Sequence, residues 1–366
     1  MDQGCKARRK VNGSFGARPV LLERFRDLLP VTSATPLLTL GEGATPLVRV
    51  PRLGAAIGAS DLWLKVEGAN PTGSFKDRGM VMAVAKAAES GARAIVCAST
   101  GNTSASAAAY AAAAGLEAIV LLPAGKIAAG KLLQAFAAGA KVISIDGNFD
   151  DALEIVRELG AGGGGVEIVN SINPHRIAGQ ATAAHEIIAD LGDAPDVLAL
   201  PVGNAGNISA YWRGFTDAVR IGSTKRRPRM AGFQAAGAAP FVSGAPIANP
   251  ETIATAIRIG KPASWDLAIA ARDESGGFIR AVTDDEILRA QADIIRLGGI
   301  FVEPACAAPI AGLRNAIADG SIDGSARIVA VMTGFGLKDP DTASRLVGEI
   351  RQSDATVADV RRALGW

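Results

Sequence analysis

The sequence between residues 94 and 122 is AIVCASTGNTSASAAAYAAAAGLEAIVLL. It begins and ends with short apolar runs that contain β-branched residues. The alanine-rich run between them opens with small polar residues and closes at Gly115. Because alanine favours helices and glycine commonly ends them, this segment predicts a strand, a helix and a second strand. Such a unit, with two parallel strands joined through a helix, is the building block of α/β sheets.

The same alternation continues on both sides of this unit. We expect helices near 76–89, 103–114 and 127–138, and strands at 62–66, 94–98, 118–122, 141–145, 197–202 and 328–332. Gly91, Gly115 and Gly139 stand where the three helices would end. The pattern therefore predicts an α/β protein with mostly parallel, twisted sheets that are covered by helices.

The length of 366 residues exceeds what one hydrophobic core usually organises, so we expect two domains with a ligand site between them. The glycine run 162–165 is a candidate crossing point between the two domains. We expect residues 18–55 and 167–366 to form the larger domain and 56–166 the smaller one. The basic segment 1–17 is predicted to be a disordered tail.

The composition argues against nucleic-acid, membrane and metal partners. A formal net charge of +2 lacks the basic excess of a nucleic-acid-binding protein, and no apolar run reaches the roughly 20 residues that span a bilayer. Cys5, Cys97 and Cys306 are too widely spaced to suggest a disulfide framework or a zinc site, and His175 and His185 are the only histidines. We therefore expect a soluble cytoplasmic protein without a bound metal.

The segment NPTGSFKDRGM (70–80) places Lys76 just inside the start of a predicted helix. We expect Ser74 to cap this helix and Asp77 to complete a capping box. The positive end of the helix dipole and partial burial both lower the pKa of an amine, so Lys76 is suited to form an imine. The ordinary alternative is a solvated lysine at a helix start.

The segment ASTGNTSASAAAY (98–110) leads from a strand into a helix through small polar residues. Backbone N–H groups at the start of the helix, together with the side chains of Ser99, Thr100, Asn102 and Thr103, can hold a carboxylate at the carboxyl edge of the sheet. A well-capped helix without a ligand explains the same residues equally well.

Two later segments also follow predicted strands. In PVGNAGNISAYWRG (201–214), Gly203 and Gly206 leave room for a phosphate that successive backbone N–H groups would bind. In TGFGLKDP (333–340), the Thr333 hydroxyl stands at the same sheet edge, where it can meet a ring nitrogen. Taken singly, each segment is also compatible with a simple glycine turn.

Together these segments resemble the threonine synthase family of fold-type-II pyridoxal-phosphate enzymes, whose fold is like that of the tryptophan synthase beta subunit. The resemblance extends from about residue 35 to 345 and includes KVEGANPTGSFKDRGM, ASTGNTSASAAAYAA, GKIAAGKL, IDGNFDDALE, VNSINPHRIAGQ, PVGNAGNISAYWRG, ETIATAIRIGKPASW, FVEPACAA and TGFGLKDPDTA. It implies that the chain uses pyridoxal 5′-phosphate as a carbon–oxygen lyase. The implied reaction converts O-phosphohomoserine and water into threonine and phosphate by γ-elimination and β-addition of water.

The resemblance also implies roles for individual residues. Lys76 would form a Schiff base with the cofactor, Asn102 would contact its 3′-oxygen and Thr333 its ring nitrogen. The cofactor phosphate would be bound in the larger domain by Gly203, Asn204, Ala205, Gly206 and Asn207. The substrate carboxylate would lie at Ser99, Thr100, Asn102 and Thr103, and the substrate phosphate at Asn170, Ser171 and Arg176. A guanidinium offers a phosphate two parallel hydrogen bonds, although Arg176 could instead form a surface ion pair.

Two residues depart from the family pattern: Phe335 replaces a residue that is usually polar, and Cys306 replaces a common serine. We expect Cys306 to be a small buried residue rather than a nucleophile. Alternative functions are a related enzyme, such as cysteate synthase or a threonine or diaminopropionate ammonia-lyase, and a homologue that binds the cofactor without turnover. A nicotinamide dehydrogenase is a weaker alternative, because the strand-to-helix turns lack the required glycine fingerprint. We expect a homodimer, and no activation by S-adenosylmethionine of the kind found in plant forms with a long N-terminal segment.

Overall fold

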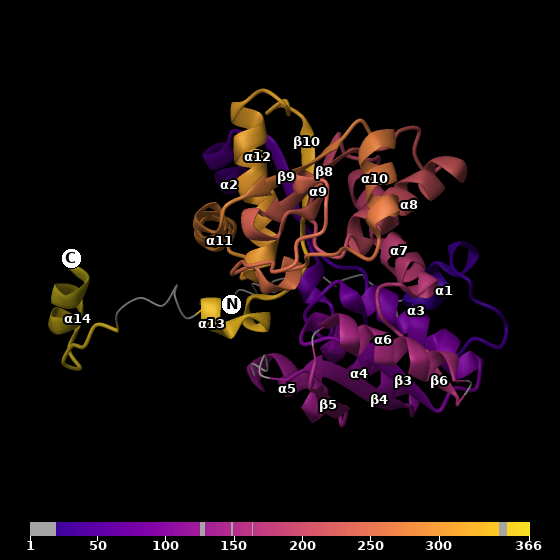
Figure 1. The fold of residues 1–366 in the computed structure, drawn as a ribbon. Helices are drawn as coiled ribbons and strands as arrows, with labels where there is room; N and C mark the ends of the chain where they lie inside the picture. Colours follow the sequence, from indigo (N-terminus) through magenta and orange to yellow (C-terminus); the bar gives the residue numbers. More distant parts are fainter. Residues whose placement is uncertain (1–19, 125–128, 148, 163, 344–349) are drawn as a thin grey trace, which may run out of the picture.

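The computed structural model describes residues 20–124, 129–147, 149–162, 164–343 and 350–366. The predicted tail at 1–17 and the first two residues of the predicted helix 127–138 lie outside these ranges. The chain folds into two α/β lobes, each built on its own sheet (Figure 1). Among the described residues, no helix combines the length and the apolar character needed to cross a membrane.

The larger lobe contains a six-stranded sheet in the order β1-β2-β10-β7-β8-β9. All neighbouring strands are parallel except the first pair, in which Leu47 to Arg49 run antiparallel to β2. The strands are β1 (Leu47–Arg49), β2 (Asp61–Val66), β7 (Val197–Pro201), β8 (Arg229–Ala235), β9 (Phe278–Val282) and β10 (Arg327–Met332).

The smaller lobe contains a four-stranded, fully parallel sheet in the order β5-β4-β3-β6. Its strands are β3 (Ala94–Ala98), β4 (Glu117–Pro123), β5 (Lys141–Ile145) and β6 (Val166–Ile168). The buried faces of β3 and β4 are rich in valine, isoleucine and leucine, as expected for parallel strands that are covered on both sides.

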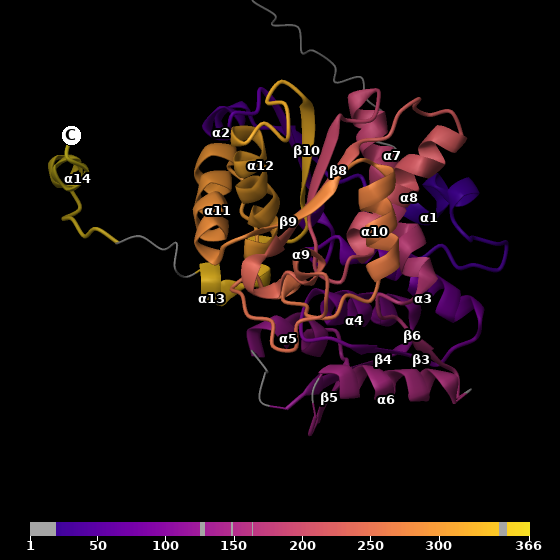
Figure 2. The same ribbon diagram turned by 45° about the horizontal axis from the view of Figure 1, so that its top comes forward.

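Helices cover both faces of each sheet, which gives four hydrophobic cores (Figure 2). In the larger lobe, one face packs against α2 (Pro51–Ile57), α11 (Asp284–Gly298) and α12 (Ala308–Ala318), and the other against α7 (Pro174–Leu191), α8 (Gly206–Arg220) and α10 (Trp265–Glu274). In the smaller lobe, one face packs against α3 (Lys76–Glu89), α4 (Asn102–Ala114) and α5 (Ala129–Ala137), and the other against α6 (Phe149–Ala161).

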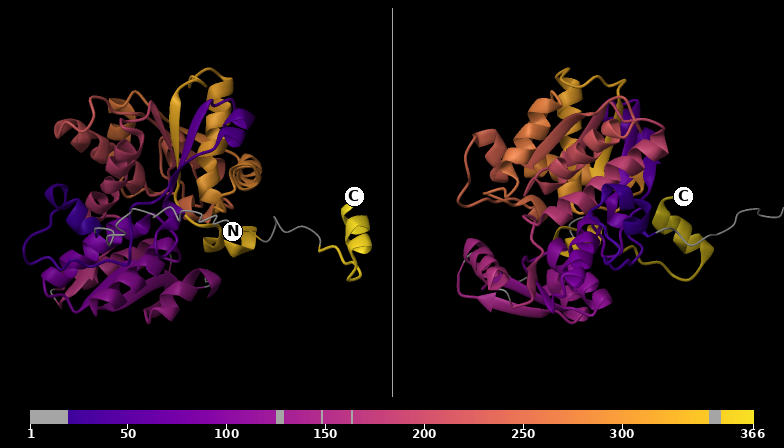
Figure 3. Two further views of the ribbon diagram at one scale, coloured as in Figure 1. Left: turned by 180° about the vertical axis from the view of Figure 1, so that it is seen from behind. Right: turned by 90° about the vertical axis from the view of Figure 1, so that its right-hand side faces the viewer.

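The remaining elements are short. They are α1 (Leu21–Arg24), α9 (Pro240–Ser243), α13 (Pro340–Ala343), α14 (Val357–Leu364) and the 3-10 turns η1 (Arg26–Leu28), η2 (Glu67–Ala69), η3 (Ala236–Ala238), η4 (Thr255–Ile257), η5 (Pro304–Ala307) and η6 (Gly336–Lys338). Near the C-terminus, α14 stands apart from both lobes and carries no buried side chain (Figure 3).

The predicted α/β fold is confirmed, and the predicted strands and helices agree with the observed ones to within about two residues over the described ranges. Gly115 ends α4 in the left-handed conformation (φ 69°), as its position suggested. Two details of the predicted organisation differ. Strand β2, which the expected boundary at 56 grouped with the smaller domain, pairs with β1 and β10 in the larger lobe. The glycine run 162–165 precedes β6 of the smaller sheet, so the chain crosses between lobes only after β6.

The chain crosses between the two sheets through α3, which joins β2 to β3, and through α7, which joins β6 to β7. These two helices pack against each other at a pair of glycines. A Cβ atom on Gly179 would lie 2.0 Å from the carbonyl oxygen of Arg78, and one on Gly79 would lie 2.7 Å from that of Arg176. Only glycine permits this backbone contact, so the crossing fixes how closely the two lobes approach.

We therefore predict that Gly179→Ala lowers the free energy of unfolding by about 1–3 kcal/mol, because the added methyl group must push the backbones of α3 and α7 apart. Urea denaturation of the purified protein measures the change. Gly298→Ala is the matched control, since this helical glycine has room for a methyl group at 3.6 Å from its nearest neighbour. The control is expected to be neutral or to stabilise by up to about 1 kcal/mol. Equal effects of the two substitutions would contradict the crossing argument.

Candidate active site

A cavity of about 280 Å³ lies between the lobes, at the carboxyl ends of β3, β7 and β10. This edge is where open parallel sheets usually bind ligands. Every site residue predicted from the sequence lines this cavity: Lys76, Ser99, Thr100, Asn102, Thr103, Asn170, Ser171, Arg176, Gly203, Asn204, Ala205, Gly206, Asn207 and Thr333. Residues from segments that are far apart in the chain therefore meet at one place.

Lys76 is the first residue of α3 and its side chain is half-buried against the cavity. Burial and, to a smaller extent, the positive charge of Arg176 lower the pKa of its amine to about 7, and the carboxyl of Glu303 acts in the opposite direction. The ammonium nitrogen lies 4.4 Å from the centroid of the Phe75 ring. A large fraction of the Lys76 amine is therefore neutral near pH 7, which is compatible with the predicted role of an imine-forming lysine.

The predicted capping box at the start of α3 is wrong. Helix α3 begins at Lys76, its N-cap is Phe75, and no side chain caps it. The Asp77 carboxylate instead turns toward its own preceding loop and accepts hydrogen bonds from the Thr72 N–H (2.7 Å), the Thr72 hydroxyl and the Ser106 hydroxyl. Burial nevertheless raises the pKa of Asp77. This carboxylate ties the lysine loop to α4 rather than capping α3.

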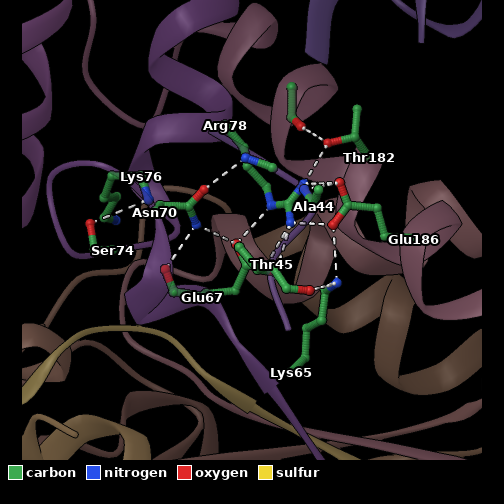
Figure 4. Close-up of polar contacts among 12 residues, drawn as sticks. Ala44, Thr45, Lys65, Glu67, Asn70, Ser74, Lys76, Arg78, Thr182 and Glu186 are labelled. Atoms are coloured by element: carbon green, nitrogen blue, oxygen red, sulfur yellow. Dashed lines mark hydrogen bonds and ion pairs between the residues drawn. The ribbon is translucent and has the colours of Figure 1, made fainter. Parts of the chain in front are cut away.

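A network of buried charges holds α3 in place two residues after Lys76 (Figure 4). The Arg78 guanidinium, which is 1% exposed, donates to Glu67 at 2.7 and 2.8 Å and to Glu186 at 2.6 and 2.9 Å. Lys65 donates to Glu186 at 3.0 Å. Two cations thus balance two carboxylates in a part of the protein from which water is excluded.

The network also sets the charge of its members. Burial raises the pKa of Glu67, but the positive charge of Arg78 outweighs this effect and holds that pKa below its usual value. The same balance lowers the pKa of Glu186. Glu67 follows β2 and Glu186 lies in α7. Arg78, in α3, therefore joins the two crossing helices to the carboxyl end of β2 in the larger sheet.

In the loop between β3 and α4, one side chain stabilises the loop itself and two others line the cavity. The Ser99 hydroxyl accepts hydrogen bonds from the backbone N–H groups of Gly101 (3.2 Å) and Ser104 (3.3 Å). The side chains of Thr100 and Thr103 line the cavity. Ser99 thus stabilises the turn before α4, in line with the alternative of a well-capped helix. The two threonines remain in position to contact a ligand.

The loop from Gly203 to Asn207 wraps one end of the cavity. A Cβ atom on Gly203 would lie 2.9 Å from the Ile257 Cα, so no larger residue fits there. Ala205 has a left-handed conformation (φ 65°), which is unusual for alanine, and it immediately precedes α8. A left-handed residue followed by a helix start turns successive N–H groups toward one point, which is the geometry of an anion-binding nest.

Arg176 is 1% exposed, and only one of its nitrogens has a partner: Nη1 donates to the Val169 carbonyl at 3.1 Å. Its Nε and Nη2 atoms are buried without a hydrogen-bond acceptor among the described residues. Burial lowers the pKa of this guanidinium to about 10. A buried cation with two unused donors requires an anion for its stabilisation.

Asn170 and Ser171 lie beside Arg176 but are already engaged. The Asn170 amide exchanges two hydrogen bonds with the backbone of Ala98, both at 3.0 Å, and so holds the end of β3. The Ser171 hydroxyl accepts from Asn204 at 2.6 Å. These bonds connect the segment after β6 to the other loops of the cavity.

Thr333 follows β10 directly and is 3% exposed. Its hydroxyl lies 3.5 Å from the sulfur of Cys306. Cys306 is fully buried, and burial raises the pKa of its thiol to about 12, so the expectation of a small buried residue is confirmed. Phe335 does not line the cavity: its ring packs edge-on against Phe301 at 5.6 Å.

Sequence reasoning missed three charged residues of the cavity, Arg258, Glu303 and Lys338. Burial raises the pKa of Glu303 to about 7, and its carboxyl accepts from the Asn102 amide. Lys338 donates to the Thr72 carbonyl at 3.1 Å, and burial lowers its pKa. Glu303 and Lys338 stand in segments that carried the family resemblance, FVEPACAA and TGFGLKDPDTA, so their charge in otherwise apolar or glycine-rich surroundings was the available signal.

Comparison with known proteins gives consistent results. The family model described as "Pyridoxal-phosphate dependent enzyme" matches residues 38–334. The threonine synthase of Mycobacterium tuberculosis (strain H37Rv) is 57% identical over 325 residues, covering 89% of this chain and 90% of that protein. The threonine synthase of Synechocystis is 56% identical over 324 residues, covering 88% of this chain and 84% of that protein.

Solved structures with a similar fold are more distant in sequence. Maize serine racemase aligns with a TM-score of 0.70 at 22% identity, covering 82% of this chain and 91% of that one. Diaminopropionate ammonia lyase from Escherichia coli aligns with a TM-score of 0.71 at 17% identity, covering 88% of this chain and 90% of that one. At such low identity these structures establish the fold alone.

The buried network leads to a prediction about stability. We expect Arg78→Met to lower the free energy of unfolding by about 3–5 kcal/mol, because it leaves Glu67 buried without its ion-pair partner and Glu186 with only Lys65 and the partly exposed Arg24 to balance it. Urea denaturation measures the loss. Arg314→Met, which breaks a partly exposed ion pair with Asp293 of similar length (2.6 Å), is the control and should change stability by no more than about 1 kcal/mol. A similarly small effect at Arg78 would refute a central role for the network.

The lowered pKa of Lys76 leads to a second prediction. Because its amine is half deprotonated near pH 7, its rate of reaction with a small acylating reagent should rise with pH and level off just above neutrality. Peptide mass spectrometry after brief labelling at a series of pH values measures the midpoint. The exposed Lys225 is followed in the same samples as an internal reference. A Lys76 profile identical to that of Lys225 would contradict the assignment of a neutral amine.

Proposed function

The chain belongs to the pyridoxal-phosphate-dependent enzymes and, among them, to the threonine synthases, and from this we propose how its cavity binds cofactor and substrate. Its reaction converts O-phosphohomoserine and water into threonine and phosphate. The cofactor is pyridoxal 5′-phosphate, which supplies a conjugated electron sink when bound.

The residues of the cavity fit this cofactor. The nest at Gly203 to Asn207 suits a phosphate, since Gly203 has no room for a side chain and Ala205 takes the left-handed conformation. The amide nitrogen of Asn207 is buried without a hydrogen-bond acceptor among the described residues. We assign the cofactor phosphate to Gly203, Asn204, Ala205, Gly206 and Asn207.

Lys76 is assigned as the covalent attachment point and as the residue that moves protons. Its amine, with a pKa of about 7, can accept a proton from a substrate carbon and return it without a large energy difference in either direction. Thr333 is assigned to the ring nitrogen. Its hydroxyl is neutral, so it can bind this nitrogen without forcing a proton onto it. Asn102 is assigned to the 3′-oxygen.

The buried guanidinium of Arg176 indicates where the substrate phosphate binds. Its two unpartnered donors, Nε and Nη2, are buried at the cavity wall, and O-phosphohomoserine brings a phosphate that can pair with both. We assign the substrate phosphate to Arg176 and Ser171, next to Asn170. The substrate carboxylate is assigned to the start of α4, at Ser99, Thr100, Asn102 and Thr103.

We propose further that the protein is a cytoplasmic homodimer. Two of the three cysteines, Cys97 and Cys306, are buried free thiols, which is compatible with a reducing compartment. Two-fold assemblies are the most frequent oligomers.

The assignment of Arg176 predicts the effect of a conservative substitution. Arg176→Lys keeps a positive charge but loses the planar pair of donors, so kcat/KM for O-phosphohomoserine should fall at least about tenfold while cofactor binding is retained. Phosphate release, with threonine identified as the product, measures the activity, and visible absorbance measures the cofactor. Arg226→Lys, at an exposed ion pair with Asp193 outside the cavity, is the control. Unchanged kinetics in Arg176→Lys would move the substrate phosphate to another site.

A further inference from the structure

Glu303 is the one carboxylate that lines the cavity, as far as the described residues show. It is 3% exposed and stands at the start of η5 in the larger lobe. Both of its carboxyl oxygens lie 3.1 Å from the amide nitrogen of Asn102, the first residue of α4 in the smaller lobe. This contact therefore bridges the two lobes across the cavity.

The backbone around Glu303 is shaped to hold its side chain in this position. Its N–H donates to the Gly334 carbonyl at 3.2 Å. A Cβ atom on Gly334 would lie 2.2 Å from Glu303 Oε1, so the absence of a side chain at Gly334 makes the space that the carboxyl occupies. The carboxylate of Glu303 is thus buried, closely surrounded and directed at the Asn102 amide, so its orientation is fixed by the fold.

We propose that Glu303 is a positioning residue that acts through Asn102: it fixes the orientation of the Asn102 amide, so that the same nitrogen presents its second N–H to the 3′-oxygen of the bound cofactor. This inference rests on the function proposed above. The nitrogen of an asparagine amide donates hydrogen bonds and its oxygen accepts them, whereas a carboxylate can only accept. Glu303 therefore selects the nitrogen as the atom that faces it, and an Asn102 without this partner would be free to turn its oxygen toward the cofactor.

The charge of Glu303 reaches Lys76 as well. Charged and titratable groups face Glu303 from several elements: Lys76 from α3, Lys338 and Asp339 from the segment around η6, and Cys306 from η5. Burial raises the pKa of Glu303 to about 7, while Asn102 and the nearby cations oppose this shift. Its negative charge in turn favours the protonated form of Lys76.

A double-mutant cycle tests whether Glu303 acts through Asn102. The apoprotein is titrated with pyridoxal phosphate, and the visible absorbance gives the dissociation constant for wild type, Glu303→Ala, Asn102→Ala and the double variant. We expect Glu303→Ala to weaken cofactor binding about tenfold, the size of one charge-assisted hydrogen bond. The double variant should bind no more weakly than Asn102→Ala alone. Multiplicative losses in the double variant would overturn the proposal.

A second substitution separates the charge from the hydrogen bond. Glu303→Gln keeps an acceptor oxygen but removes the negative charge, so cofactor affinity should stay within about threefold of wild type. The rate at which the apoprotein binds the cofactor covalently should then show its pH midpoint shifted to lower pH, because Lys76 loses a neighbour that favours its protonated form. An unchanged midpoint in Glu303→Gln would contradict the electrostatic part of the argument.

Two controls make the outcomes distinct. Glu42→Gln changes another buried carboxylate, which accepts from Tyr110 at 2.7 Å and does not line the cavity, and it should leave cofactor affinity unchanged. Thermal unfolding of each apoprotein shows whether a variant has folded. If the wild-type protein itself bound no cofactor, the proposed function would fail. If the wild type binds it and the two substitutions act independently, only the role of Glu303 fails.

Discussion

A single buried guanidinium joins the two places where the chain passes between its sheets. Arg78 lies in α3, pairs with Glu186 in α7, and pairs with Glu67 at the end of β2. Four charged side chains are tolerated in the protein interior only when each is paired with an opposite charge and hydrogen-bonded. The positions of all four are therefore strongly coupled. Because Lys76 is two residues before Arg78 on the same helix, the network also determines where the reactive amine stands.

The chemistry of the cavity follows from the same exclusion of water. Desolvation disfavours any charge, so it lowers the pKa of Lys76 and raises that of Glu303, and both values come to about 7. Arg176 remains charged, because even its lowered pKa of about 10 is well above neutrality. Arg176 thus supplies a permanent positive charge for an anionic substrate, while Lys76 and Glu303 change charge close to physiological pH, the range where proton transfer is easiest in both directions.

Local patterns in the sequence predicted the parts of this structure that local forces determine. The strands and helices were readable from apolar runs and glycine positions. The loops around Lys76, Asn102, Gly203 and Thr333 could be assigned to one site because each follows the carboxyl end of a strand, although these strands belong to two sheets rather than one. Partners that depend on tertiary contacts were not readable. Ser74 and Asp77 had the spacing of a capping box, but the Asp77 carboxylate accepts hydrogen bonds from the hydroxyls of Thr72 and Ser106 instead. Similarly, nothing in an apolar alternation says which of two sheets a strand such as β2 will join.

The contacts that hold the lobes together differ in strength around the cavity. On the side of the crossing helices, the contact consists of glycine-to-backbone packing and fully buried ion pairs. Around Glu303 and Lys338 it consists of hydrogen bonds: Asn102 donates to Glu303, Lys338 donates to the Thr72 carbonyl, and the loop before α3 exchanges backbone hydrogen bonds with the segment after β10. The first kind loses several kcal/mol when a partner is displaced, and the second about 1–3 kcal/mol. The crossing of α3 and α7 is therefore the stronger of the two contacts, and it keeps Lys76 in place.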